Sequence, residues 1–473
     1  MDAAEFRRLG HELIDWIAEH REGIENLPVM SRMNPGEVRA AFPSTPPSQG
    51  GGLEALKSTL EGPIRDGITH WPHPGFFAYF PSNTSYASVL GDLLCAGLGA
   101  QGMSWQTSPA ATELEEVVMD WLRQMLGLST AWTGVIQDTA STATLGALLC
   151  ARERSSSFSQ NGGGLQSLDA PLVVYASDQG HSSIEKAALL AGFGKANLRL
   201  LPTDEDHALR VDALEEAIEA DLKAGLQPCA IVACIGTTGT TAVDPLAAIA
   251  QAAERHGLWL HVDAAMAGSA MILPECRGLW EGVERADSLV LNPHKWMGVG
   301  FDFSAYYVRD PQHLIRVMST NPSYLRTAQD GEVKNFRDWH LQLGRRFRAL
   351  KLWMVLLDQG VEGLQARLRR DLENAQWLKK QVDQAPDWER LAPVPLQTLC
   401  IRHHPAGMDD EAALASHNLD LVRRINEDGH SYLTPSILKG RQMIRVSIGS
   451  ETTERRHVEG LWEELRAAAH GKS

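Results

Sequence analysis

The residues whose types most clearly suggest chemistry follow an apolar run at 288–291, which leads into Asn292-Pro-His-Lys295. A lysine placed after a strand can point into a crevice, where partial burial lowers the pKa of its amine. The neutral amine is a nucleophile that forms a Schiff base with an aldehyde cofactor. Most lysines in such positions are solvated surface charges, so this stretch by itself leaves both interpretations open.

A carboxylate follows a second apolar run. Residues 259–262 lead to Asp263, and strand alternation puts His261 and Asp263 on one face. Such a carboxylate ligates a metal, caps a helix, forms a salt bridge, or lies against a pyridine nitrogen and keeps it protonated. A protonated pyridine ring is the electron sink that a carbanion needs. We expect no metal, because further ligands at a fitting spacing are not evident.

Two polar turns open predicted helices. The turn Thr139-Ala-Ser141 precedes a good helix, whose N-terminal N–H groups and dipole make an anion site. An ordinary Ser/Thr cap has the same sequence. The turn at His181 follows the run 172–175, and its imidazole either stacks on a planar ring or is a capping or core histidine. The four stretches together favour the chemical interpretation, because each follows a predicted strand or begins a helix.

The elements that must position these residues alternate between strand and helix over 79–360, the predicted large domain. Apolar runs occur at 172–175, 230–235, 259–262 and 288–291. This alternation predicts an α/β fold with a largely parallel sheet covered by helices on both faces. Ligands in such folds bind beyond the carboxyl ends of the strands.

Two further parts flank the predicted large domain. Residues 1–78 are predicted to form a helix and an extended arm, which has little core of its own. We expect this arm to lie on a second subunit, with packing on its own chain as the alternative. Residues 361–473 are predicted to form a small α+β domain, entered through a helical stretch near 343–353.

Composition limits the class of protein. The 473 residues include 44 Lys+Arg and 59 Asp+Glu, a formal charge of −15. An acidic chain without a basic run argues against nucleic-acid and anionic-membrane binding, so we expect a small-molecule substrate. The six cysteines show no CxxC pattern, no apolar stretch approaches the ~20 residues that span a bilayer, and residues 1–10 lack a signal-peptide pattern. We therefore expect a cytoplasmic protein.

Longer motifs run along nearly the whole chain: His73-Pro-Gly-Phe-Phe-Ala-Tyr-Phe-Pro81, Ser108-Pro-Ala-Ala-Thr-Glu-Leu-Glu115, Gln137-Asp-Thr-Ala-Ser141, the His181 loop, His261-Val-Asp-Ala-Ala265, Asn292-Pro-His-Lys295 and Leu343-Gly-Arg-Arg-Phe-Arg-Ala-Leu-Lys351. With these motifs the chain resembles the pyridoxal-phosphate-dependent group II decarboxylases, most closely the aromatic-L-amino-acid decarboxylases, in a bacterial-looking version. Motifs of this length in this order are highly specific.

The resemblance implies the fold type I transferase architecture, with a mostly parallel seven-stranded sheet, and an obligate homodimer with active sites at the interface. It also implies pyridoxal phosphate held as an aldimine on Lys295, with Asp263 at the ring nitrogen. The implied reaction decarboxylates an aromatic L-amino acid of the dopa, tyrosine, tryptophan or phenylalanine class through an external aldimine and a quinonoid. Its products are the amine and CO2.

The resemblance assigns roles to further residues. Tyr324, on a mobile loop, is implied to protonate the carbanion, with His181 as another proton donor. The implied cofactor contacts are Ala140, Ser141, Asn292 and His294 at the phosphate, His181 over the ring, and Thr238 and Ala265 at its edge or opposite face. The implied substrate contacts are Trp71, Tyr79, Phe80, Pro81, Ser82, Gln101 and Met103.

Some positions depart from the family pattern. Asp138 puts a negative charge at the phosphate turn, where animal relatives have glycine, so its side chain must face away or meet a base. Gln101 and Met103 stand where animal relatives carry an aliphatic residue and phenylalanine, so the identity of the substrate's aromatic ring stays open. Arg445, in a late strand, leaves open an aminotransferase that retains the α-carboxylate. An aldehyde synthase and a catalytically dead scaffold on the same fold stay open as well.

Overall fold

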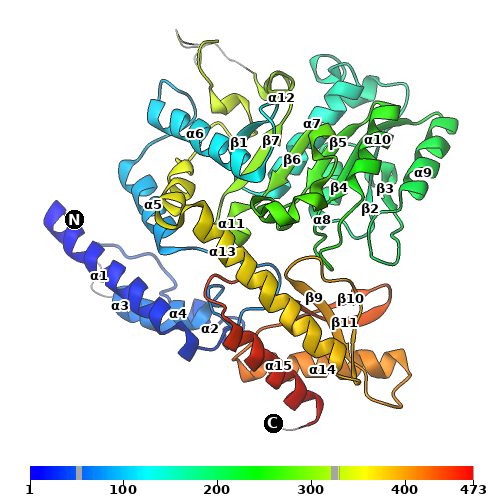
Figure 1. Cartoon of the computed structure of the whole chain (residues 1–473). Coiled ribbons are helices and arrows are strands. Elements are labelled where there is room, and N and C mark those ends of the chain that lie inside the picture. Colours follow the sequence, from blue (N-terminus) through cyan, green and yellow to red (C-terminus); the bar gives the residue numbers. More distant parts are fainter. Residues whose placement is uncertain (50–55, 321–328, 330, 472–473) are drawn as a thin grey trace. The chain divides into compact units, whose positions relative to one another are not determined.

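The computed structural model describes residues 1–49, 56–320, 329 and 331–471. The chain divides into two compact units (Figure 1). The small unit comprises residues 1–81, 377–391 and 401–473, and the large unit comprises residues 82–376 and 392–400. The three-part division with breaks after 78 and 360 stays a prediction.

Within the described residues, the large unit holds a seven-stranded sheet in the order β1-β7-β6-β5-β4-β2-β3. Strand β7 is antiparallel to β1 and β6, whereas the other neighbouring pairs are parallel. The prediction of a mostly parallel sheet is therefore confirmed. The strands are β1 (Thr133–Gln137), β2 (Leu172–Ser177), β3 (Leu198–Leu201), β4 (Gln227–Cys234), β5 (Trp259–Asp263), β6 (Ser288–Leu291) and β7 (Ser304–Val308).

Helices cover this sheet (Figure 1). The helices of the large unit are α5 (Tyr86–Leu98), α6 (Pro109–Leu126), α7 (Ala140–Ser155), α8 (Ser182–Leu190), α9 (Val211–Lys223), α10 (Leu246–His256), α11 (Pro293–Trp296), α12 (Pro311–Met318) and α13 (Ala349–Gln384), which continues into the small unit. The helix expected over 343–353 begins only at Ala349, so this expectation was wrong for 343–348. In this segment the backbone carbonyl of Arg345 accepts from Gly102 N at 2.9 Å, outside any helix, and its side chain pairs with Glu115.

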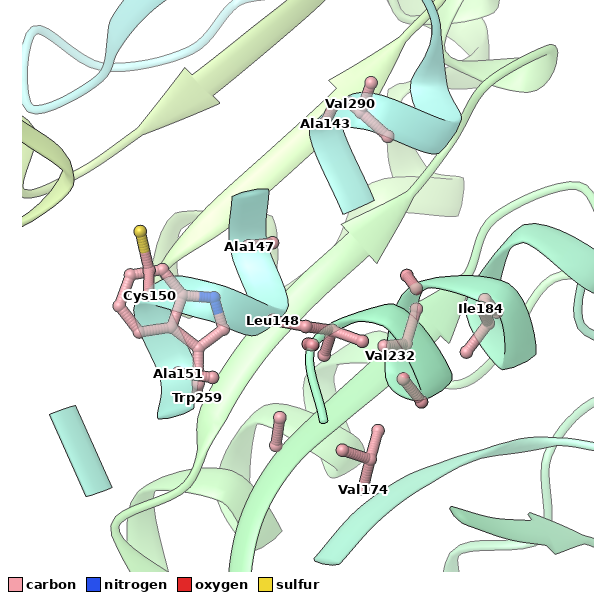
Figure 2. Close-up of a cluster of buried hydrophobic side chains, with 14 of the residues drawn as sticks. Ala143, Ala147, Leu148, Cys150, Ala151, Val174, Ile184, Val232, Trp259 and Val290 are labelled. Carbon is pink, nitrogen blue, oxygen red and sulfur yellow. The ribbon is translucent and has the colours of Figure 1, made fainter. Parts of the chain in front are cut away.

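The core of the large unit fixes helix α7 against the sheet (Figure 2). Small side chains at Ala143, Ala147 and Ala151 let the helix approach the sheet closely, and these three residues are fully buried. They belong to one apolar cluster with Val174 of β2 and Val232 of β4. Because close packing leaves the helix little freedom, the first turn of α7 has a fixed place at the sheet edge.

The small unit has its own sheet. Within the described residues it has four strands in the order β10-β11-β9-β8. The strands are β8 (Trp388–Arg390), β9 (Thr398–His403), which enters this unit at residue 401, β10 (Thr434–Leu438) and β11 (Arg441–Ser447). The helices are α1 (Ala3–Glu22), α2 (Glu37–Ala40), α3 (Leu56–Thr59), a π-helical turn at Leu60–Ile64, α4 (Arg65–Gly67), α14 (Glu411–Asp428) and α15 (Arg455–Ala469).

The end of the N-terminal arm packs on its own chain. Phe77 N donates to Tyr432 O at 3.0 Å, and Ser447 N donates to Phe77 O at 2.9 Å. Val29, Phe76 and Ala78 form a small buried cluster against Tyr432. Among the described residues, the helices lack an apolar stretch of the length needed to cross a membrane.

Candidate active site

Two of the predicted residues lie at the same edge of the large sheet. Asp263 is the last residue of β5, and Lys295 follows the neighbouring parallel strand β6 within the single turn of α11. Asp263 is 7% exposed, and its Oδ1 accepts a hydrogen bond from Ala265 N at 3.1 Å. Because parallel strands end at one edge, the fold brings the carboxylate and the amine to the same side of the sheet.

His181 joins this edge from the end of β2. Its Nδ1 caps α8 by accepting from Ser183 N at 3.1 Å, so the ring proton lies on Nε2. Partial burial of the ring lowers its pKa, Asp263 acts in the opposite direction, and the cation of Lys295 lowers it further. Asp263 and Lys295 therefore lie near enough to His181 to act on its charge, and all three lie at or after the ends of strands of the same sheet.

The first turn of α7 forms the predicted anion cradle. Thr139 is its N-cap, and the N–H groups of Ala140 and Ser141 have no partner inside the helix by its geometry. The charge of Asp138 is directed at neighbouring donors, since its Oδ1 accepts from Thr139 N at 2.6 Å and its Oδ2 from Gln342 Nε2 at 3.3 Å. The carboxylate therefore stabilises the turn.

A buried ion pair holds the strand that leads into this cradle. Arg345 Nη2 and Nη1 donate to Glu115 at 2.7 and 2.8 Å, and Arg345 Nη2 also donates to Ile136 O at 2.7 Å. Glu115 Oε1 accepts from Ile136 N at 2.9 Å. Sequence reasoning missed this positioning pair, although both residues lie in motifs that carry the family resemblance, because only the fold brings residues 230 positions apart together.

Asn292 and His294 lie between β6 and Lys295 and are buried. Asn292 Oδ1 accepts from Ser304 Oγ at 2.6 Å, which leaves its amide N–H2 as the group it can offer a ligand. His294 Nδ1 accepts from Phe303 N at 3.0 Å. Burial, aided by the Lys295 cation, lowers the pKa of His294 to about 3, so this residue is a neutral donor rather than a cation.

Thr238 and Ala265 follow the ends of β4 and β5. Thr238 is exposed and Ala265 is half-buried, so both offer surface to a ligand. The turn that carries Thr238 needs glycine at Gly236, whose φ is +83°. A Cβ there would lie 2.5 Å from Ala267 Cβ.

The predicted substrate contacts in the large unit are Ser82, Gln101 and Met103. Gln101 Oε1 accepts from Met103 N at 2.7 Å, so its amide nitrogen is the group left for a ligand. Gln101 also lines a cavity of about 510 Å³ whose wall includes Asp138 and His340. The structure therefore connects Gln101 with the phosphate turn.

The predicted substrate contacts Trp71, Tyr79, Phe80 and Pro81 belong to the small unit. The ring of Trp71 stacks on that of Tyr79, with 5.9 Å between the ring centroids. Arg445 donates to Tyr79 O, and its guanidinium lies 4.4 Å from the centre of the Phe80 ring. This arginine therefore holds the Tyr79-Phe80 backbone.

The structure assigns a place to His261 but not to Tyr324. His261 is fully buried, and its ring nitrogens contact Ser288 Oγ at 2.9 Å and Thr144 Oγ1 at 3.4 Å. Its pKa is lowered to about 4 by burial, so it is a neutral core histidine. Tyr324 lies outside the described residues.

The donor set fits pyridoxal phosphate. Helix N-terminal N–H groups suit a phosphate, a carboxylate at a strand end suits a pyridinium nitrogen, and an amine nearby suits an aldehyde. Asp263 and Lys295 both act electrostatically on His181, and the strands that lead to them, β5 and β6, are parallel neighbours. The first turn of α7 follows β1, which is a strand of the same sheet.

Comparisons with known proteins agree with this fit. The pyridoxal-dependent decarboxylase conserved domain matches residues 35–404. Aromatic-L-amino-acid decarboxylase of Bos taurus is 43% identical over 482 residues, covering 99% of this chain and 97% of the relative. Phenylacetaldehyde synthase of Arabidopsis thaliana is 41% identical over 479 residues, covering 99% and 96%. A crystal structure of Oryza sativa TDC with PLP and tryptamine has a TM-score of 0.96 at 37% identity, covering 100% of this chain and 99% of that one. This chain belongs to the pyridoxal-dependent decarboxylase family and has its fold type I α/β architecture, with pyridoxal phosphate as the cofactor.

Proposed function

We propose that this protein decarboxylates an aromatic L-amino acid to the corresponding amine and CO2. The observation that carries the proposal is the convergence of Asp263, Lys295 and His181 at one edge of the large sheet. Relatives that act on aromatic amino acids, at about 40% identity over 99% of the chain, support the substrate class.

Each residue at this edge has a proposed task. When bound, pyridoxal phosphate supplies an aldehyde for the substrate amine and a ring that accepts the electron pair left by CO2. Lys295 holds the cofactor through its amine, and the Asp263 carboxylate keeps the ring nitrogen protonated. The N–H groups of Ala140 and Ser141 bind the phosphate, together with the amide of Asn292 and the imidazole of His294.

The remaining contacts complete the proposed site. His181 stacks on one face of the ring and its Nε2 proton is available for transfer, whereas Thr238 and Ala265 line the edge or the opposite face. We propose Tyr324 as the proton donor to the substrate carbon. The proposed contacts of the substrate ring are Trp71, Tyr79, Phe80, Pro81, Ser82, Gln101 and Met103.

The test is a substrate panel. Purified protein with pyridoxal phosphate is incubated with the standard amino acids and dopa, and CO2 and amines are measured. An aromatic amine formed together with CO2 is expected. Lys295→Ala is expected to abolish turnover and to prevent borohydride from fixing the cofactor on the chain. Turnover that needs a 2-oxo acid and releases no CO2 would instead identify an aminotransferase.

One relative favours a second candidate. A phenylacetaldehyde synthase is 41% identical to this chain, so an aldehyde is the alternative product. An aldehyde synthase consumes O2 and releases ammonia and hydrogen peroxide besides CO2, whereas a decarboxylase releases the amine. Oxygen uptake and peroxide measured on the same samples distinguish the two, and Tyr324→Phe is expected to raise both.

We propose that the working form is a homodimer in which the part of the 1–78 arm ahead of Val29 lies on the second copy, whereas Val29 and residues 76–78 pack on their own chain. Helix α5 supports this proposal, because a row of its large apolar side chains is 43–63% exposed: Tyr86, Leu90, Leu93, Leu94 and Leu98. An apolar helix face of this kind needs a covering surface. The mass in solution tests the proposal, and Leu93→Arg is expected to lower it to that of one chain.

A further inference from the structure

The helix that carries Lys295 is too short for its own hydrogen bonds to fix its position. Helix α11 has four residues, Pro293–Trp296. The last carbonyls of any helix lack partners within it, and in a single turn this affects nearly every carbonyl. The position of the Lys295 amine depends on this turn, because the side chain is a flexible stem attached to it.

A buried side chain from a distant segment holds the carbonyl of Lys295 itself. Asn83 Nδ2 donates to Lys295 O at 2.7 Å. Asn83 is 2% exposed and lies in the segment just before α5. A buried carbonyl without a partner costs about 1–3 kcal/mol, so this bond restrains the turn where the amine is attached.

Two further bonds join the same pair of segments. Ser85 N donates to Gly298 O at 2.8 Å, and Gly300 N donates to Ser88 Oγ at 2.7 Å. The segments 83–88 and 295–300 therefore lie side by side. They approach closely, since a Cβ on Gly300 would lie 3.0 Å from Thr84 Cγ2.

Helix α13 restrains the next residue. Arg367 Nη2 donates to Trp296 O at 2.7 Å, and Trp296 Nε1 donates to Asp371 Oδ2 at 2.8 Å. Trp296 and Asp371 are fully buried. The carbonyls of Lys295 and Trp296 are thus satisfied by two side chains that the fold brings from opposite directions along the chain.

We propose that Asn83 is a positioning residue for Lys295: by binding the carbonyl of that residue it places the amine for its bond to the cofactor. The proposal rests on the proposed function, in which Lys295 carries the cofactor. The amine must return to the same point in every turnover, and small misplacements of reacting groups cost large factors in rate. Asn83 acts through the backbone of Lys295.

The experiment compares two isosteric replacements. Asn83→Leu removes the donor at similar volume and is expected to lower kcat about tenfold with KM nearly unchanged. It is also expected to slow borohydride labelling of Lys295 by the cofactor and to raise the dissociation constant of pyridoxal phosphate, both measured without substrate. These readouts report the amine rather than turnover.

Asn83→Asp adds a pH test. Its carboxylate would face the Lys295 carbonyl, and both burial and this contact raise the pKa of the new carboxyl. The protonated form donates again, so kcat and labelling relative to the unmutated chain are expected to recover as the pH falls. The defect of Asn83→Leu is expected not to recover. This variant also tests the proposal where Asn83→Leu fails to fold.

Asn418→Leu is the matched control. Asn418 is 1% exposed, and its Nδ2 donates to His403 O and to Leu414 O at 2.9 Å in the small unit. This variant is expected to lower Tm while leaving labelling of Lys295 unchanged. If Asn83→Leu lowers Tm only, with wild-type kcat and labelling, the positioning role is overturned. If the unmutated chain takes up no cofactor on Lys295, the proposed function fails and this inference fails with it.

Discussion

Two groups of histidines and carboxylates in this molecule contain the same types of side chain but lie in different surroundings. In the large unit, Asp263 and His181 lie at strand ends beside Lys295. In the small unit, His403 Nε2 contacts Asp387 Oδ2 at 3.1 Å and His403 Nδ1 contacts His417 Nε2 at 2.7 Å. We call the second group the small-unit cluster.

The two groups differ in which hydrogen-bonding atoms they leave available to a ligand. Both ring nitrogens of His403 are used by the protein, and the residue is 3% exposed. His181 uses Nδ1 to cap its helix, and Nε2 of its partly buried ring is left for a ligand. Residue type alone therefore does not make a site. Chemical capacity arises where the fold places polar groups at strand ends and leaves part of their bonding capacity to a ligand.

The largest expected effect separates the two carboxylates. Asp263→Asn keeps shape but removes the charge at the proposed ring nitrogen, so kcat is expected to fall about 10³-fold. Asp387→Asn is expected to change kcat less than about twofold, because its partner is a structural histidine. Steady-state kinetics on both variants test this, and similar losses would mean that the two groups do not differ in function.

The two histidines offer the next comparison. His181→Asn retains a good helix N-cap while removing the ring, so kcat is expected to fall about 10²-fold with little change in Tm. His417→Asn is expected to keep wild-type kcat within about twofold. Tm and kcat measured on the same preparations distinguish the outcomes, and a His181→Asn enzyme with normal kcat would remove this residue from the site.

The small-unit cluster should reveal itself in stability rather than in rate. Burial lowers the pKa of His403 and His417 below the ordinary 6.5, so the unfolded chain binds more protons than the folded one under mildly acidic conditions. The free energy of unfolding therefore falls as the pH drops below 6.5 toward the lowered pKa values of the folded state, and solvent screening keeps this slope small.

Urea unfolding on both sides of pH 6.5 measures this slope. His417→Asn removes one titrating group. The number of protons taken up on unfolding, which the slope measures, is therefore expected to fall by up to about one. An unchanged slope would show that the lowered pKa of His417 does not contribute to stability.

The smallest effect concerns specificity. Gln101 offers only its amide nitrogen, because its oxygen is bound by Met103 N. Gln101→Ile is expected to shift the ratio of kcat/KM between hydroxylated or nitrogen-containing rings and phenylalanine toward phenylalanine by about tenfold or less. A substrate panel on both proteins measures the ratio, and a constant ratio would exclude this residue from ring recognition.

Local pattern was enough for the buried strands. The apolar run predicted at 288–291 is strand β6 (Ser288–Leu291), and the runs at 172–175 and 259–262 lie within β2 and β5. Other strands escaped prediction for physical reasons. Strand β1 contains Gly134 and runs into a polar turn, β3 is four residues at the sheet edge, and the three-residue β8 has hardly any period. Short edge strands depend on their neighbours rather than on their own sequence.

The sequence by itself determined the chemistry of the candidate residues and the strand ends on which they lie, since both follow from residue type and apolar pattern. Only the tertiary structure decided how these residues are held: the ion pair of Arg345 with Glu115, the bond from Gln342 to Asp138, and the bond from Asn83 to Lys295 O. The reason is that hydrogen bonds between segments 204 to 230 residues apart leave no periodic trace in the chain.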